Sequence, residues 1–189
     1  MNPARAARLR AALLDPAEAA LIEVEGSAKA AVLVPLDERD GELFAVFTRR
    51  RDDLRQHAGQ ISFPGGRVDS ADADLVDTAL REASEEIGLP RDAVTVLGAL
   101  DPISVRVSGF ALYPFVGDIA APVSWTPAPR EVEEVLELAL TALAGSYALR
   151  TIRRGDREVE TPSFIAELDV IWGATAYVLR DLLARIGLL

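Results

Sequence analysis

The stretch Arg81-Glu-Ala-Ser-Glu-Glu-Ile-Gly-Leu89 decides the fold, because it joins an amphipathic helical pattern to a dense group of carboxylates. Apolar residues recur at spacings of three and four along it and the preceding turns, namely at Val76, Ala79, Leu80, Ala83 and Ile87. Such spacing places them on one stripe of a helix. The pattern predicts a helix over residues 72–89 that packs this stripe on a core and ends at Gly88, a residue type favoured after helix ends.

The carboxylates of this stretch are expected on the side of the helix that faces away from the core. Glu82 and Glu86 lie about 40° apart around a helix axis, with Glu85 on the outer side of the same face. Three carboxylates this close repel one another, and a divalent cation would organise them. Arg81 lies four residues before Glu85 and is expected to pair with it, which leaves Glu82 and Glu86 as the metal pair. The alternative is a solvated acidic helix face.

Strand and helix patterns surround this segment on both sides. Strands are predicted at 29–35, 42–48, 94–100 and 110–116, with a further hairpin at 147–153 and from 159 onward. Residues 131–140 fit either a strand or a helix, and terminal helices are expected at about 3–14 and 172–187. Strands and helices interleave without internal repeats. The pattern therefore predicts an α/β fold with a single domain over residues 1–189.

The composition narrows the possible chemistry. The chain has 30 Asp and Glu against 20 Lys and Arg, a net charge of −10, so nucleic acid is not an expected partner. It has no cysteine, which excludes disulfides, thiol catalysis and Cys-ligated metals. A single histidine, His57, excludes a His-rich metal site. Any metal chemistry is therefore expected to use carboxylates, which favours Mg²⁺ or Mn²⁺.

Nothing in the sequence predicts a membrane partner or export. Residues 1–14 are Ala- and Arg-rich without the apolar core of a signal peptide, and no run of 18 apolar residues occurs. The expectation is a soluble cytoplasmic protein.

The acidic helix and the turn before it resemble the Nudix box, the loop–helix–loop signature of Nudix hydrolases. That signature reads Gly-x5-Glu-x7-Arg-Glu-U-x-Glu-Glu-x-Gly-U, with U aliphatic. The matching positions are Gly66, Asp72, Arg81, Glu82, Ala83, Glu85, Glu86, Gly88 and Leu89. Asp72 stands at the first Glu position, and eight residues rather than seven separate it from Arg81.

A second match resembles the coenzyme A pyrophosphatases, a subfamily of the Nudix hydrolases. The motif just upstream of the box is Phe47-Thr-Arg-Arg50, then Leu54-Arg-x-His57-x-Gly59-Gln-Ile-Ser-Phe-Pro-Gly-Gly66. Late in the chain, Ile171-Trp-Gly-Ala-Thr-Ala176 also looks like the start of that subfamily's C-terminal helix.

These resemblances imply an α/β/α sandwich with a mixed β-sheet and a loop–helix–loop catalytic motif. They imply catalytic roles for Arg81, Glu82, Glu85 and Glu86, with Mg²⁺ or Mn²⁺ as cofactor. Glu82 and Glu86 would bind the metal. Further candidate ligands are Glu85 and one of the later glutamates, Glu131 or Glu134, although a solvent-facing segment explains the later pair equally well.

A cluster of cations upstream of the box would suit an anionic substrate. The candidate substrate-binding residues are Arg49, Arg50, Arg55, His57, Gly65, Gly66 and Arg67. Arginine offers paired donors to phosphate oxygens, and glycines allow close backbone approach. Each of these residue types also has a structural alternative. The arginines would instead pair with nearby acids, namely Asp52, Asp53, Asp69 or Glu42. In the same way, His57 would hold a loop by hydrogen bonds, and the glycines would form a plain turn.

The resemblance implies hydrolysis of coenzyme A or its derivatives to 3′,5′-ADP and 4′-phosphopantetheine. Another nucleoside diphosphate derivative, such as ADP-ribose, is the alternative substrate within the class. The alternative from a different class is a non-catalytic Nudix-like module that binds a nucleotide. The retained glutamates at positions 82, 85 and 86 disfavour it. The oligomeric state does not follow from the sequence.

Overall fold

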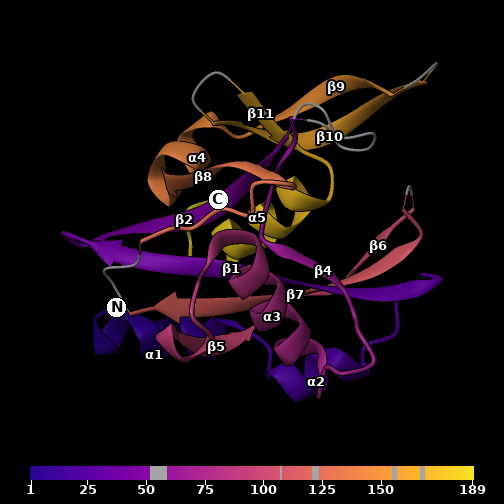
Figure 1. Ribbon diagram of the computed structural model, residues 1–189. Helices are drawn as coiled ribbons and strands as arrows, with labels where there is room; N and C mark the ends of the chain where they lie inside the picture. The colour runs from indigo at the N-terminus through magenta and orange to yellow at the C-terminus, as the bar shows by residue number, and fades with distance from the viewer. Residues whose placement is uncertain (52–58, 107, 121–123, 155–156, 167–168) are drawn as a thin grey trace.

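The computed structural model describes residues 1–51, 59–106, 108–120, 124–154, 157–166 and 169–189 (Figure 1). The helices are α1 (Pro3–Ala12), α2 (Pro16–Leu21), α3 (Leu75–Ile87), α4 (Leu140–Ser146) and α5 (Ala174–Arg185). The strands before α3 are β1 (Ala28–Arg39), β2 (Glu42–Arg50), β3 (Ile61–Ser62) and β4 (Gly65–Arg67). Those after it are β5 (Val94–Ala99), β6 (Ile103–Val105), β7 (Phe110–Ile119), β8 (Val132–Ala139), β9 (Ala148–Arg154), β10 (Arg157–Ala166) and β11 (Asp169–Trp172).

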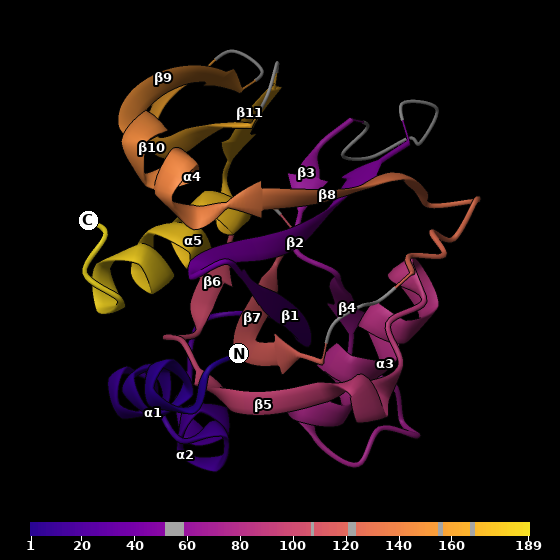
Figure 2. The same cartoon turned by 90° about the vertical axis from the view of Figure 1, so that its left-hand side faces the viewer.

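The main sheet is mixed. Its strand order is β3-β2-β1-β7-β5, and β4, β6 and β8 pair with β1, β7 and β2. β1 and β7 run parallel, whereas the other pairs are antiparallel. A separate small sheet of β9, β10 and β11 lies beside α4 and α5 (Figure 2). The connections bring the start of β8 beside the end of β2, close to α3.

Alternation along β1 divides the core into two layers. Ala31 and Leu33 pack in the cluster that contains the buried face of α3, whereas Val34 and Leu36 pack in the cluster of α1, α4 and α5. Successive side chains of a strand point to opposite faces, so an uninterrupted apolar strand needs cover on both sides. The expected α/β/α sandwich with a mixed sheet is confirmed.

The central helix α3 has most of the apolar stripe that the sequence predicts. Ala79, Ala83 and Ile87 are fully buried, whereas Val76 and Leu80 are partly buried. Leu75, which the predicted stripe did not include, is also buried. The helix begins after Asp74, whose carboxylate accepts from the backbone N–H of Asp77 at 2.8 Å, and Gly88 ends it with φ +70°. The expected start at residue 72 is three residues too early, because Asp72 belongs to the preceding loop.

Several shorter elements differ from the expectations. The first helix ends at Ala12, and Asp15 caps an additional short helix, α2. The connection between β5 and β7 contains β6, and the ambiguous segment 131–140 is the strand β8 followed by α4. The terminal helices expected at about 3–14 and 172–187 correspond to α1 and α5. Among the described residues, every helix is too short or too polar to cross a bilayer.

Candidate active site

The carboxylate of Glu86 is buried beneath the turn that leads into β4. The backbone N–H of Gly65 donates to Glu86 Oε2 at 3.1 Å, and 8% of the Glu86 side chain is exposed. An added Cβ at Gly65 would lie 2.4 Å from the carbonyl oxygen of Ala31, so only glycine allows this close approach. The expectation that Glu86 faces outward is wrong, because β4 covers this part of α3.

The carboxylate of Glu82 occupies the space where Gly66 has no side chain. A Cβ at Gly66 would lie 2.5 Å from Glu82 Cδ. Arg81 Nη1 donates to Glu82 Oε1 at 2.9 Å, and 18% of the Glu82 side chain is exposed. The two adjacent glycines therefore bring the backbone of β4 against both Glu82 and Glu86.

Asp72 is held by a closed network around Arg81. Arg81 Nε and Nη2 donate to the two carboxylate oxygens of Asp72 at 2.7 and 3.0 Å, and 2% of the Asp72 side chain is exposed. The Thr78 hydroxyl and the Asp69 N–H also donate to Asp72, each at 2.8 Å. These bonds, with Arg81 foremost, lower the pKa of Asp72, and Asp72 in turn raises the pKa of Arg81. Asp72 thus fixes the loop to the helix.

Arg81 also reaches Glu85, which lies at the outer edge of the acidic group. Arg81 Nη1 is 3.2 Å from Glu85 Oε2, the pairing that their spacing of four predicts. Glu85 has 60% of its side chain exposed, so it is open to solvent beside Glu82. Arg81 is therefore shared among three acids and positions them from within the protein.

Of the two later glutamates, Glu131 is the one beside the helix. Glu131 is a source of the electrostatic repulsion felt by both Glu82 and Glu86. Its backbone carbonyl accepts from Arg51 N–H at 3.2 Å at the end of β2. Glu134 instead pairs with Arg49, whose Nε is 3.3 Å from Glu134 Oε2.

The loop before β8 fixes Glu131 relative to α3. The Ala128 N–H donates to the Glu86 carbonyl at 2.8 Å, and the Thr126 N–H donates to the Ile87 carbonyl at 3.0 Å. These bonds satisfy carbonyls that the end of a helix leaves without intrahelical partners. The loop therefore brings residues from the second half of the chain to the carboxylate end of α3.

Burial and mutual repulsion disfavour the charged forms of the inner carboxylates. Burial is the main cause that raises the pKa of Glu86 to about 7, with smaller contributions from Glu82 and Glu131. The Gly65 N–H and Arg50 oppose this rise. Burial also raises the pKa of Glu82, although Arg81 opposes it. The site therefore holds more negative charge than its own cations neutralise.

This donor set fits a hard divalent cation. Carboxylate oxygens are the ligands that Mg²⁺ and Mn²⁺ prefer, and a cation would relieve the repulsion among Glu82, Glu86 and Glu131. Within the described residues, no three acidic or histidine side chains already converge at metal-binding distance. Cation binding by Glu82 would compete with its contact to Arg81.

The predicted substrate-binding arginines have different surroundings. Arg50 lies beside the site, with Nη1 4.0 Å from Glu86 Oε1. Arg49 pairs with Glu134 and Asp169, in line with the structural alternative although with other acids than those expected. Arg67 is exposed, and its guanidinium lies over the ring of Phe110. Arg55 and His57 lie outside the described residues.

A groove of about 240 Å³ opens beside Arg50 and Gly65. Trp172 lines it together with Phe63 and Val178, so the C-terminal segment forms part of its wall. The sequence pattern around Trp172 does not mark it as a site residue. A tryptophan at the start of an apolar helix is typical of core packing, and only the tertiary fold brings it to the groove.

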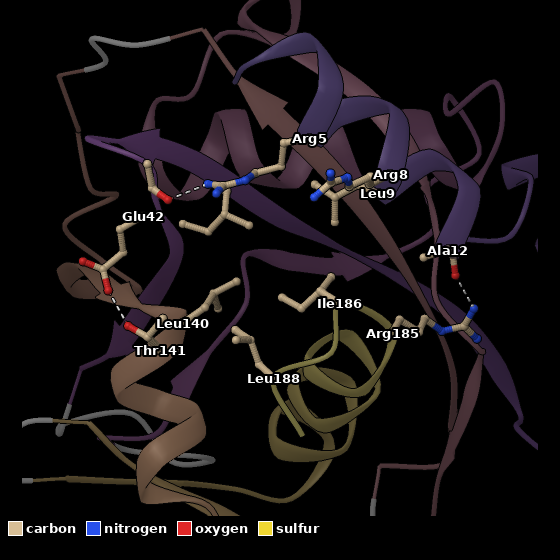
Figure 3. A pocket seen from close by; sticks show the side chains of 12 residues that line it. Arg5, Arg8, Leu9, Ala12, Glu42, Leu140, Thr141, Arg185, Ile186 and Leu188 are labelled. Carbon is tan, nitrogen blue, oxygen red and sulfur yellow. Dashed lines mark hydrogen bonds between the residues drawn. The ribbon is translucent and has the colours of Figure 1, made fainter.

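Another hollow, of about 510 Å³, lies between α1, the β1–β2 turn, α4 and α5 (Figure 3). Its polar groups are largely engaged within the fold. Arg5 donates to the Gly41 carbonyl at 2.8 Å, Arg185 donates to the Ala12 carbonyl at 2.9 Å, and Thr141 bonds Glu42 (Figure 3). None of the predicted catalytic residues lines it.

The raised pKa of Glu86 predicts that cation binding strengthens with pH. Below about pH 7 a proton competes with the cation for Glu86. The Mg²⁺ affinity should therefore rise by up to about tenfold per pH unit between about pH 5.5 and about pH 7, and it should level off above about pH 7. Titration calorimetry with MgCl₂ would measure this. An affinity that stays constant over this range would contradict a role for Glu86 in cation binding.

The raised pKa of Glu86 has the opposite effect on the cation-free protein, whose stability should fall as the pH rises. The pKa of Glu86 in the folded protein exceeds the ordinary value of 4.5, so the folded state binds the proton more tightly than the unfolded state. This contribution to stability is complete below about pH 4.5 and is lost as the pH rises through about 7. Urea unfolding at several pH values, with and without Mg²⁺, would detect it.

Comparisons with known proteins identify the family. The NUDIX domain model matches residues 27–159. A Salmonella paratyphi B protein described as an uncharacterized Nudix hydrolase, NudL, is 41% identical over 162 residues, which cover 84% of this chain and 83% of the relative.

Solved structures share the fold at low sequence identity. A MutT/nudix family protein from Enterococcus faecalis has a TM-score of 0.59 at 17% identity, covering 88% of this chain and 64% of the other. DR0079 from Deinococcus radiodurans has a TM-score of 0.54 at 16% identity, covering 83% and 84%. The glutamates on α3 agree with these matches. The domain match and the 41% identical relative show that the chain belongs to the Nudix hydrolase family, whose members act on diphosphate linkages.

Proposed function

We propose that this enzyme hydrolyses the diphosphate linkage of coenzyme A and its derivatives to 3′,5′-ADP and 4′-phosphopantetheine. One observation supports coenzyme A as the substrate, which is more specific than the activity shared by the family. The two segments that resemble coenzyme A pyrophosphatases outside the Nudix box lie far apart in sequence, yet both line the groove beside Glu86. They are Gln60, Ile61, Ser62 and Phe63 on one side and Trp172, Gly173, Ala174 and Thr175 on the other.

The groove suits one part of this substrate. Phe63 stacks on Phe47 with ring centroids 4.5 Å apart, which gives the groove a rigid apolar wall. Arg50 is the one cation among the described residues that line the groove. A wall of this kind fits the uncharged pantetheine arm better than the ribose 3′-phosphate.

The acidic residues of α3 would carry the reaction. Glu82 and Glu86 would hold Mg²⁺ or Mn²⁺, which neutralises phosphate oxygens and lowers the pKa of water. Glu85 or Glu131 would accept the proton of the attacking water, since both are exposed at the edge of the acidic group. Arg81 would position these acids without contacting the substrate.

Arg50 would bind the diphosphate. Its Nε is buried and has no hydrogen-bond partner among the described residues, while its Nη1 faces Glu86. A buried donor without a partner is costly, and a phosphate oxygen would satisfy it. This contact would place the substrate between the acidic residues and the groove.

A comparison of substrates tests the proposal. We expect kcat/KM with Mg²⁺ or Mn²⁺ to be higher for coenzyme A than for ADP-ribose, NADH or diadenosine polyphosphates, with 3′,5′-ADP among the products. Preference for ADP-ribose by about tenfold or more, equivalent to about 1.4 kcal/mol, would overturn the coenzyme A assignment. Absence of metal-dependent turnover on every substrate would favour a nucleotide-binding module.

Replacement of Arg50 by alanine should lower kcat/KM for coenzyme A by about tenfold or more. Loss of one charge-assisted phosphate contact costs about 1.5–3 kcal/mol. Arg10→Ala is the matched control, since Arg10 is an exposed arginine on α1. Steady-state kinetics would show the difference, and equal values for the two variants would remove Arg50 from substrate binding.

A further inference from the structure

A second, larger hollow adjoins the groove beside Glu86, because the two share part of their lining. This hollow has a volume of about 670 Å³ and lies between β6, residues of strands β9 and β10, and the start of α5. The two spaces have four lining residues in common, Val105, Trp172, Gly173 and Ala174. Trp172 therefore stands at the junction between them.

The walls of the larger hollow are mainly apolar. They include Pro102, Ile103, Ile152, Val159 and Tyr177. Val159 and Tyr177 are 43% and 38% exposed, so the hollow keeps large apolar side chains in contact with water. Ile152 and Val159 are cross-strand partners on β9 and β10, so they share one face of the small sheet. An apolar group placed there would remove this surface from water.

We propose that this hollow binds the acyl group of an acyl-coenzyme A, and that the cross-strand pair Ile152 and Val159 sets the preference for acyl length. The inference rests on the proposed function. With the diphosphate at Arg50 and α3, the pantetheine arm follows the groove and carries its sulfur towards Trp172. The acyl chain then continues past Trp172 into the larger hollow.

The rival occupant is the adenosine 3′-phosphate end of the substrate. Among the described residues that line the hollow, Arg106 is the one that is charged, and its side chain is exposed. The pantetheine arm is longer than the nucleoside, however, and Arg50 lines the groove but not the hollow. The longer, apolar arm therefore fits this path better.

The first test compares acyl chains on the unmodified enzyme. We expect kcat/KM for octanoyl-coenzyme A to exceed that for acetyl-coenzyme A by about tenfold or more, because each methylene group in an apolar pocket contributes to discrimination. Turnover of coenzyme A itself tests the proposed function separately. If coenzyme A is cleaved but acetyl and octanoyl forms are cleaved equally well, the acyl site is refuted and the proposed function stands.

The second test places a charge in the hollow. Val159→Glu should lower the ratio of kcat/KM for octanoyl-coenzyme A to that for coenzyme A by about tenfold, because a carboxylate opposes burial of the acyl chain. Leu149→Glu is the matched control. Leu149 is 55% exposed and pairs with Pro162 on the same small sheet, on the face opposite to Ile152 and Val159. The ratio of kcat/KM values in the Leu149→Glu variant should therefore stay within about twofold of that in the unmodified enzyme.

A third substrate separates the rival. Val159→Glu could change the ratio of kcat/KM for coenzyme A to that for 3′-dephospho-coenzyme A while leaving the ratio of kcat/KM for octanoyl-coenzyme A to that for acetyl-coenzyme A unchanged. In that case the hollow holds the nucleotide and the acyl proposal is wrong. Loss of octanoyl preference in Leu149→Glu as well would show an effect of surface charge and would also overturn the proposal.

Discussion

Replacement of Glu86 by glutamine should lower turnover about 100-fold or more. The substitution keeps the size of the side chain and removes one charge from the carboxylates that would hold the cation. The measurement is kcat at saturating Mg²⁺. Near-normal turnover in this variant would contradict the assignment of Glu86.

The cation-free Glu86→Gln protein should be at least as stable as the unmodified protein at about pH 8. Burial raises the pKa of Glu86, so its charged form is unfavourable in the folded state and a neutral amide removes that cost. Glu133→Gln is a matched control, since Glu133 is exposed on β8. Its turnover should equal that of the unmodified enzyme. A loss of activity in Glu86→Gln caused by unfolding would appear in the urea curve.

Replacement of Asp72 by alanine should lower the free energy of unfolding by about 3 kcal/mol. The change leaves Arg81 partly buried without its main partner, and removal of one partner of a buried ion pair costs about 3–5 kcal/mol. The lower figure applies because Glu82 and Glu85 still contact Arg81. Urea unfolding at about pH 7 would measure the change.

Asp92→Ala provides the comparison for Asp72. Asp92 is an exposed aspartate in the short turn before β5, so its replacement should change stability by less than about 0.5 kcal/mol. Asp72→Ala should also weaken Mg²⁺ binding, because Arg81 is then free to hold Glu82 more firmly. A loss of stability no greater than that of Asp92→Ala would show that the Arg81–Asp72 pair does not stabilise the loop.

The sequence was most informative where structure depends on nearby residues. The buried positions Ala79, Ala83 and Ile87 and the end of the helix at Gly88 follow from spacing within a few turns. The Arg81–Glu85 contact follows from the same periodicity. These features needed no knowledge of the remaining chain, and the structure agrees with them.

The sequence could not reveal contacts made between distant segments. Glu86 is buried because β4 lies over it, and helical periodicity alone places it on the outer face. The choice between Glu131 and Glu134 depends on where β8 begins to pair with β2, which a run of alternating acidic and apolar residues leaves open. Trp172 reaches the groove only through the return of the C-terminal segment to β3 and β4.

The hydrogen bonds from the Thr126–Ala128 loop to the end of α3 limit how this enzyme can be recombined with its relatives. The helix carries Glu82, Glu85 and Glu86, while the loop that closes its last carbonyls leads three residues later to Glu131. The space around Gly88 is also matched to Thr126, since a Cβ at Gly88 would lie 2.8 Å from the Thr126 Cβ. A chimera that exchanges α3 alone would separate two halves of one fitted unit. Helix and loop must be transplanted together for the acidic residues to keep their spacing.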